Sequence, residues 1–303
     1  MSGSHTKGHR TKGHRIKGHR MNRGRMWAVA RNDLRQLAHS PDFWAPMVVL
    51  AALFFVIIPT ILLLTITNLG TVGTVKNVSA ALDILPQAAQ DAIRGDNDAD
   101  RTSYALAVYL FAPMAVIVPM TISTAVGANT IVGEKEKGTG EFLAHSPASV
   151  REIYLGKLIA SLVPGYLTTL IGFGCYSLAV NLIVGPHVGG WFFPTRAWWV
   201  LMLWVVPPFL ALTLSVVLRL SARVKSAAAA QQASGLVTLP LIMISYAQST
   251  GGLLGAGSAG LWVGLFAWTA AIFGLMRGAH AVTRPRLLGV DSDARAAAAA
   301  RPG

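Results

Sequence analysis

Long runs without a single charged residue divide this chain, and they limit its possible folds more than any other feature. A helix that crosses a lipid bilayer needs roughly 20 consecutive apolar residues. Each of the first four runs has room for one such helix, and the fifth, 51 residues long, has room for two with a turn near 249–252. The sequence therefore predicts six membrane spans. The five runs are 43–75, 102–133, 158–195, 197–218 and 226–276.

The predicted fold class is an all-α integral membrane protein. Only 13% of the residues are charged, against about 25% in a typical soluble domain, and this excludes a soluble enzyme. We expect a disordered basic His/Gly tail at 1–25, an interfacial amphipathic helix at 26–42, a transmembrane domain at 43–280 and a cytoplasmic tail at 281–303. The spans are expected near 43–67, 104–131, 158–184, 197–218, 226–247 and 257–277.

Basic residues predict which side of the membrane each connection faces. Cytoplasmic loops collect Lys and Arg, whereas exported loops do not. With the N-terminus inside, 22 of the 26 Lys and Arg residues fall on the cytoplasmic side. The four on the outer side are Lys76, Arg94, Arg101 and Arg196. We therefore expect a multi-pass protein with both termini in the cytoplasm.

Much of the net charge of +13 lies in an N-terminal repeat, HTKGHRTKGHRIKGHR. Glycine in every copy argues against a stable fold, and we expect no nucleic-acid partner. Beside a membrane, such a tail is expected on anionic lipid headgroups, where each cation contributes about 1 kcal/mol. A metal site at its histidines is the alternative, but regular spacing on a flexible chain sets no ligand geometry.

Residues 26–42 carry the pattern of an amphipathic helix in the membrane interface. Ser40 and Pro41 predict the end of this helix and the start of the next, since serine caps helices and proline suits the first helical position. Apolar residues on one face are Met26, Trp27, Ala30, Leu34, Leu37 and Ala38, and polar residues on the other are Arg31, Asn32, Arg35 and Gln36.

No charged residue lies between the ends of any predicted span. Ion-coupled carriers usually bury Asp, Glu, Lys or His along their pathway, so we expect the energy for transport to come from elsewhere. Neutral polar residues in the spans are candidates for lining a pathway, although hydrogen bonding between helices is the commoner role of each. They are Thr168, Tyr176, Asn181, Gln231, Gln232 and Ser234. The only cysteine, Cys175, is expected to be buried.

Two glycine patterns suggest nucleotide sites, and neither has the required chemistry. The segment 133–139 has the glycine spacing of a P-loop, but Thr139 stands where the phosphate-binding lysine must be. The segment 255–260 matches the dinucleotide fingerprint in a predicted turn, with no strand before it. We therefore expect no catalytic residue, no metal and no bound ATP in this chain.

The segment 133–157, GEKEKGTGEFLAHSPASVREIYLGK, is charged between two uncharged runs. Glycines at 138 and 140 break one helix, and 141–143 restart a short one. Ser149 and Glu152 have the spacing of a capping box, which satisfies two free backbone N–H groups. A pair of short helices on the cytoplasmic side is therefore predicted before the third span.

This segment resembles the signature between the second and third spans of type-2 ATP-binding-cassette exporter permeases. The resemblance rests on G-E-K-E-K-G-T-G-E-F-L followed by S-P-A-S-V-R-E-I-Y-L-G-K. It extends weakly to the interfacial helix, to Ala-Gln-Gln at 230–232 and to 284–288. Gly140 departs from the bulkier residue that the family usually has there.

The resemblance implies that this segment is a coupling helix, which docks on a separate ATP-binding-cassette subunit. It also implies a second permease copy or a sister permease as partner, and the plasma (inner) membrane of a bacterium as location. ATP and Mg²⁺ would be bound by the cassette subunit, with no cofactor in this chain. By position, the residues that carry or shape the contact are Glu134, Glu136, Gly138, Thr139, Glu141, Pro147, Ser149, Arg151 and Glu152.

These expectations favour the permease subunit of an ATP-driven exporter for a lipid-like, amphipathic or drug-like substrate. The main alternative is a membrane-anchored scaffold that recruits a soluble partner without transporting anything. A secondary carrier is less favoured, because the predicted spans lack charged residues.

Overall fold

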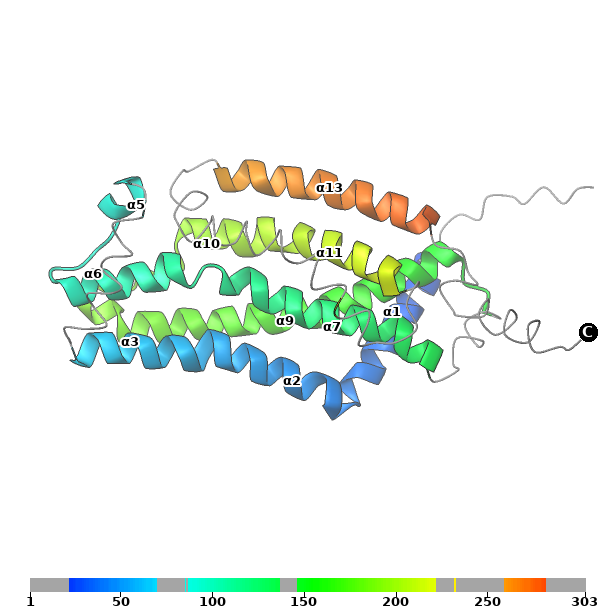
Figure 1. Cartoon of the computed structure of the whole chain (residues 1–303), viewed down its shortest axis with the longest axis horizontal. Helices are drawn as coiled ribbons and strands as arrows, with labels where there is room; N and C mark the ends of the chain where they lie inside the picture. The colour runs from blue at the N-terminus through cyan, green and yellow to red at the C-terminus, as the bar shows by residue number, and fades with distance from the viewer. Residues whose placement is uncertain are drawn as a thin grey trace, which may run out of the picture.

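The computed structural model describes residues 22–69, 85, 87–136, 146–221, 232 and 259–281. Every regular element among these residues is a helix. Long helices run side by side along the longest axis of the molecule, and α1 (Arg23–Ala38) lies at one end of them (Figure 1). We call this end the α1 end. The opposite end, which carries α5 (Gln87–Asp91) and α6 (Asp98–Ala105), is the α6 end.

The remaining helices follow in chain order. The first long helix consists of α2 (Pro41–Ala52), η1 (Leu53–Ile57) and α3 (Ile58–Leu69). After α6 come η2 (Leu106–Leu110), α7 (Met114–Glu136), α9 (Val150–Ile183) and η3 (Gly185–His187). The last described elements are α10 (Arg196–Val200), η4 (Leu201–Val205), α11 (Val206–Ser221) and α13 (Ala259–Ala281).

Five helical stretches among the described residues are long and apolar enough to cross a membrane. They are Trp44–Asn68, Asp98–Thr130, Val150–Ile183, Arg196–Leu220 and Gly260–Arg277. The prediction of an all-helical membrane protein is thus confirmed for this part of the chain. The predicted fifth span at 226–247 lies outside the described residues, as do the tail up to residue 21 and the C-terminal segment from 282.

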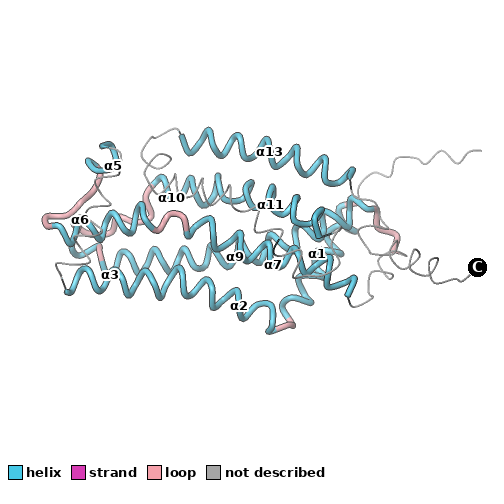
Figure 2. Tube along the Cα trace, in the orientation of Figure 1, coloured by secondary structure: helices cyan, strands magenta, loops and turns pink. Residues whose placement is uncertain are grey.

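Three of these stretches contain a five-residue π-helical turn: η1, η2 and η4. Such turns widen the helix and shift the register of the side chains that follow. In the second stretch, the turn at 111–113 also separates η2 from α7, and Figure 2 shows this break within the bundle. Most other described loops lie at the two ends of the long helices (Figure 2).

The junction of α1 and α2 agrees with the prediction in part. Pro41 is the first residue of α2, as expected, and Ser40 holds the N-cap position. The Ser40 side chain makes no capping hydrogen bond, however. The helix α1 begins earlier than predicted because Asn22 caps it, with its Oδ1 accepting from the Gly24 N–H at 2.9 Å.

A cluster of buried aromatic rings fills the bundle at the α6 end. Phe173 stacks on Trp198 with ring centroids 5.6 Å apart. Two polar groups in this cluster are paired with backbone carbonyls: the Tyr176 hydroxyl donates to Ala107 at 2.6 Å, and the Trp198 indole donates to Val108 at 2.8 Å. Aromatic packing therefore joins α9 to α10 and to η2, with its polar atoms satisfied.

Asn181 fastens the loop that follows α9. Its Oδ1 accepts from the backbone N–H of Phe192 at 2.9 Å and of Phe193 at 3.0 Å, and its Nδ2 donates to the carbonyl of Ser177 at 2.8 Å. The side chain is 5% exposed. One buried amide thus holds the returning chain against the end of α9.

Cys175 is exposed on α9, and the prediction of burial is wrong. Leu178 and Leu182, one and two turns further along the same helix, are also exposed. An apolar side chain on a membrane span needs no protein neighbour, because lipid tails are as apolar as the protein interior. Hydrophobicity alone therefore did not separate lipid-facing from protein-facing positions on this helix.

Candidate functional site

The first turn of α9 contains the predicted capping box. The Ser149 hydroxyl accepts from the Glu152 N–H at 3.3 Å, and Glu152 Oε2 accepts from the Ser149 N–H at 2.8 Å. Both bonds satisfy N–H groups that a helix start leaves free. We expected a separate second short helix here, and this prediction is wrong, because α9 continues without a break from Val150 to Ile183.

Glu152 also binds the start of α1. Its second oxygen, Oε1, accepts from the Asn22 N–H at 2.6 Å, and the carboxylate is almost completely buried. Beside it, Arg25 Nη1 donates to the Pro147 carbonyl at 2.8 Å. One carboxylate therefore serves the N-terminal ends of two helices that lie far apart in the sequence.

Gly156 allows α1 to approach α9 closely. A Cβ atom at this position would lie 2.9 Å from the Met26 carbonyl oxygen and 2.9 Å from the Val29 side chain. Real Cβ atoms do not come this close to backbone oxygen, so any larger residue would push α1 away. Glycine is needed here for helix packing rather than for a turn.

Lys157, the next residue, joins three helices. Its side chain is fully buried, its ammonium lies 3.6 Å from Asp33 Oδ2 of α1, and it donates to the Thr130 carbonyl of α7 at 2.8 Å. Burial raises the pKa of the Asp33 carboxyl above its ordinary value, and the Lys157 charge opposes that rise. Removing either charge would leave the other buried without its partner.

A small apolar cluster ties the same part of α9 to α11. Ile153, Tyr154 and Leu158 pack with Leu214, and the Tyr154 hydroxyl donates to the Ser215 carbonyl of α11 at 3.2 Å. The first turns of α9 therefore contact α1, α7 and α11 together. We call the region formed by Asn22, Arg25, Asp33, Ser149, Glu152, Gly156 and Lys157 the α1–α9 joint.

The predicted coupling residues divide into four groups. Pro147 and Arg151 are exposed beside the joint, whereas Ser149 and Glu152 are engaged inside it. Glu134 and Glu136 belong to the last turn of α7. The other predicted coupling residues, Gly138, Thr139 and Glu141, lie outside the described residues.

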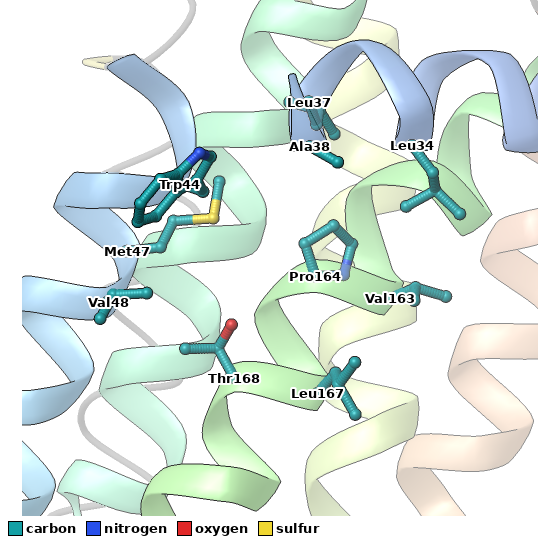
Figure 3. Close-up of a pocket in the computed structure, with 10 residues that line it drawn as sticks. All are labelled: Leu34, Leu37, Ala38, Trp44, Met47, Val48, Val163, Pro164, Leu167 and Thr168. Carbon is teal, nitrogen blue, oxygen red and sulfur yellow. The ribbon is translucent and has the colours of Figure 1, made fainter. Parts of the chain in front are cut away.

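The predicted pathway residues do not form one described cluster. Tyr176 and Asn181 lie at the α6 end, where each has the hydrogen bonds given above. Thr168 lines a separate cavity near the α1 end (Figure 3). Gln232 is exposed, and Gln231 and Ser234 lie outside the described residues. Their role in a pathway stays a prediction.

Sequence reasoning missed Asp33, Asn22 and Arg25 as parts of this site. One signal was present for Asp33, which falls among the apolar residues of α1, close to Ala30 and Leu37 on the helix surface. An acid within a buried stripe requires a cationic partner. The sequence does not indicate which cation is the partner, because Lys157 belongs to another helix far along the chain.

Comparison with known proteins places most of this chain in a described family. The model of a family described as "ABC-2 family transporter protein" matches residues 27–259. The matched region contains most of α1, the start of α9 and five of the seven residues of the α1–α9 joint; Asn22 and Arg25 precede it. No curated protein matches the chain.

Proposed function

Because this chain belongs to the ABC-2 transporter family, we propose that it is the permease subunit of an ATP-driven exporter. A separate ATP-binding-cassette subunit docks on the segment 133–157, and closure of its nucleotide sites drives the movement of the spans. A second permease copy or a sister permease completes the transporter. This assignment takes a transport role over that of a scaffold, because the matching family is one of transporters.

The α1–α9 joint is the observation that best supports this coupling role. A docked partner would contact exposed residues such as Pro147 and Arg151, which flank the capped start of α9. The same turns of α9 contact α1, α7 and α11 through Glu152, Lys157 and Tyr154. A displacement at this point would therefore be passed to three other helices.

The physical requirement for such coupling is a difference in affinity. The cassette subunit must bind this segment more tightly in one arrangement of the helices than in the other, because equal affinity shifts no equilibrium. A capped helix start keeps its shape while it moves, so it can transmit a displacement that a loop would absorb. Glu152, with partners on both α1 and α9, gives the segment that rigidity.

The proposed orientation places the α1 end in the cytoplasm of a bacterium and the α6 end outside. The cargo is a lipid-like, amphipathic or drug-like molecule. This class is supported by the apolar character of the five candidate spans, whose most apolar windows contain at most two charged residues each. Such a surface offers a hydrated small ion few ligands.

Replacing both Glu134 and Glu136 by alanine tests the coupling role. The membrane protein would be purified together with its cassette subunit. About tenfold less cassette subunit should co-purify with the variant than with the wild type, because two charges are lost from the proposed interface. In vesicles with an amphipathic fluorescent dye as cargo, ATP-driven efflux should fall while membrane insertion is unchanged.

A matched control removes two exposed acids at the other end, Asp96 and Asp98. This control has the same change in charge and should bind the cassette normally. Normal cassette binding and normal efflux in the Glu134→Ala/Glu136→Ala variant would show that the coupling assignment is wrong.

A further inference from the structure

A cavity of about 230 Å³ lies between α1, α2 and α9 near the α1 end (Figure 3). In Figure 3, side chains from the three helices face this space, and the Thr168 hydroxyl is the one oxygen drawn among them. Leu34 comes from α1, Trp44 and Val48 come from α2, and Pro164 and Leu167 come from α9. The lining is thus apolar apart from the Thr168 hydroxyl and the Trp44 indole N–H.

The size and walls of the cavity decide what it can hold. Pockets for drug-sized molecules are about 300–1,000 Å³, so this space is too small for a whole molecule of that kind. Val48 and Leu167, on opposite walls, are each more than half exposed, so the cavity opens at the surface of the bundle where lipid tails lie. One hydrocarbon chain fits both the volume and the chemistry.

A hydrocarbon chain alone gives no selectivity, because lipid tails surround every span. Selectivity for one class of lipid requires a contact with the headgroup, and α1 carries charged residues that can make this contact. Arg31 and Arg35 are both exposed on the polar side of α1, at its border with the apolar side, because each lies one turn before a residue of the cavity wall, Leu34 and Ala38 respectively. They therefore lie at the edge of the opening, where a phosphate group would lie.

The charge balance around this edge favours an anion. The only acid in α1, Asp33, is buried against Lys157 and does not line the cavity. Asp42 is exposed in the first turn of α2 and is the other nearby acid. Against it stand Arg31 and Arg35 of α1, because Arg25 at the start of the helix already lies beside the buried Glu152 carboxylate.

We propose that this cavity is a binding site for an anionic phospholipid of the surrounding leaflet. One acyl chain lies between α1 and α9, against Pro164 and Leu167, and the phosphate lies on Arg31 and Arg35. The lipid fills the space next to the α1–α9 joint and holds α1 at its distance from α2. This proposal does not depend on the exporter assignment, and the crosslinking comparisons that test it need no ATP.

The test is photo-crosslinking in nanodiscs with phosphatidylglycerol that carries a diazirine in one acyl chain, compared with phosphatidylcholine that carries the same group. In the wild type, phosphatidylglycerol should label peptides that contain 44–48 and 163–168 more strongly than phosphatidylcholine does. In the Arg31→Gln/Arg35→Gln variant, the preference for phosphatidylglycerol should fall by up to about thirtyfold, because two cations are lost and each contributes about 1 kcal/mol near a lipid surface.

A variant in which a larger side chain fills the cavity provides the second part of the test. Leu167→Trp places an indole in the opening and should reduce labelling by at least about fivefold, because the volume is then occupied. Leu178→Trp is the matched control, since Leu178 lies on the same helix with nearly equal exposure, 51% against 54% for Leu167, and outside the cavity. It should label like the wild type.

Two outcomes would overturn the proposal. Equal labelling by both lipids, unchanged in the arginine variant and in Leu167→Trp, would mean that only bulk lipid contacts this surface. Transfer of the labelled phosphatidylglycerol to the opposite leaflet during ATP hydrolysis by the complete transporter, with loss of the crosslink, would mean that the cavity holds cargo rather than a resident lipid.

Discussion

The two ends of the bundle are held together by different kinds of contact. At the α6 end, buried aromatic rings pack face to face and edge to face with centroids 5–6 Å apart, and Asn181 fixes the returning loop through backbone hydrogen bonds. At the α1 end, a carboxylate, an ion pair and one glycine hold α1 to α9. The aromatic contacts of the α6 end are stable as long as water is kept out. The charged contacts of the α1 end can be broken and formed again.

This difference indicates which end can move. Separating the aromatic cluster would expose several large rings and unpair the Tyr176 hydroxyl, so no second arrangement of similar energy is available. Charged hydrogen bonds can exchange one partner for another, because a docked protein or lipid can replace the contact that is lost. We therefore expect the α6 end to keep its packing while the α1 end changes.

Thiol labelling should give the largest effect, an all-or-none difference between the ends. In a Cys175→Ala background, Asp96→Cys at the α6 end should react with a membrane-impermeant reagent added outside intact cells, and Arg151→Cys at the α1 end should not. Both original side chains are exposed, so burial does not explain the result. After permeabilisation, both should react. Reaction of Arg151→Cys in intact cells would reverse the proposed orientation.

Removal of a buried ring tests the packing of the α6 end. Trp198→Ala should lower the free energy of unfolding by about 3–5 kcal/mol, because the indole is almost fully buried and its N–H is bonded. Trp191→Ala is the matched control, since Trp191 is 70% exposed, and it should change stability by less than about 0.5 kcal/mol. Unfolding in nanodiscs, followed by fluorescence, measures both. Similar losses in the two variants would contradict a special role for the cluster.

Lys157→Met should make the docking of α1 more strongly dependent on pH than it is in the wild type. Without the ammonium, the pKa of the buried Asp33 rises further above its ordinary value. The docked state then binds a proton more readily than the free state, so docking is favoured at low pH and weakens as pH rises through the raised pKa. The loss should reach up to about 3 kcal/mol at high pH.

Hydrogen exchange of residues 23–38, corrected for the intrinsic rate, measures this docking. Protection in Lys157→Met should be greater at about pH 5 than at about pH 8, in the direction that the raised pKa requires. The double variant Asp33→Asn/Lys157→Met has no charge to titrate in the pair and should show equal protection at both values. A pH dependence in the double variant would assign the effect to another group.

The elements that sequence reasoning predicted correctly are those with local causes. Charge-free runs indicated where five helices long and apolar enough to cross a membrane lie, Pro41 marked the start of α2, and Ser149 with Glu152 marked the start of α9. The length of that last helix was misjudged. A capping box fixes where a helix begins but carries no information about how far it extends, and Pro164 did not end α9.

The α1–α9 joint was largely unpredictable because its contacts are between distant residues. Glu152 was assigned to the capping box, but its bond to Asn22 depends on how two helices pack. Gly156 and Lys157 were noted as part of a motif, yet their packing against α1 appears only in three dimensions. The exposure of Cys175 was missed for a related reason. Lipid tails and the protein interior are equally apolar, so the hydrophobicity of a residue does not tell which of the two it contacts.

The long separation between the two halves of the joint has a consequence for biosynthesis. Asn22 is translated 130 residues before Glu152, which at about 5–20 residues per second is a delay of roughly 6 to 26 s. During that time, Asp33 has no Lys157 beside it, so the nascent α1 must keep its acid in water or among lipid headgroups. The α1 end is therefore completed only after the first turns of α9 have been made, although α1 is the first of the described helices to leave the ribosome.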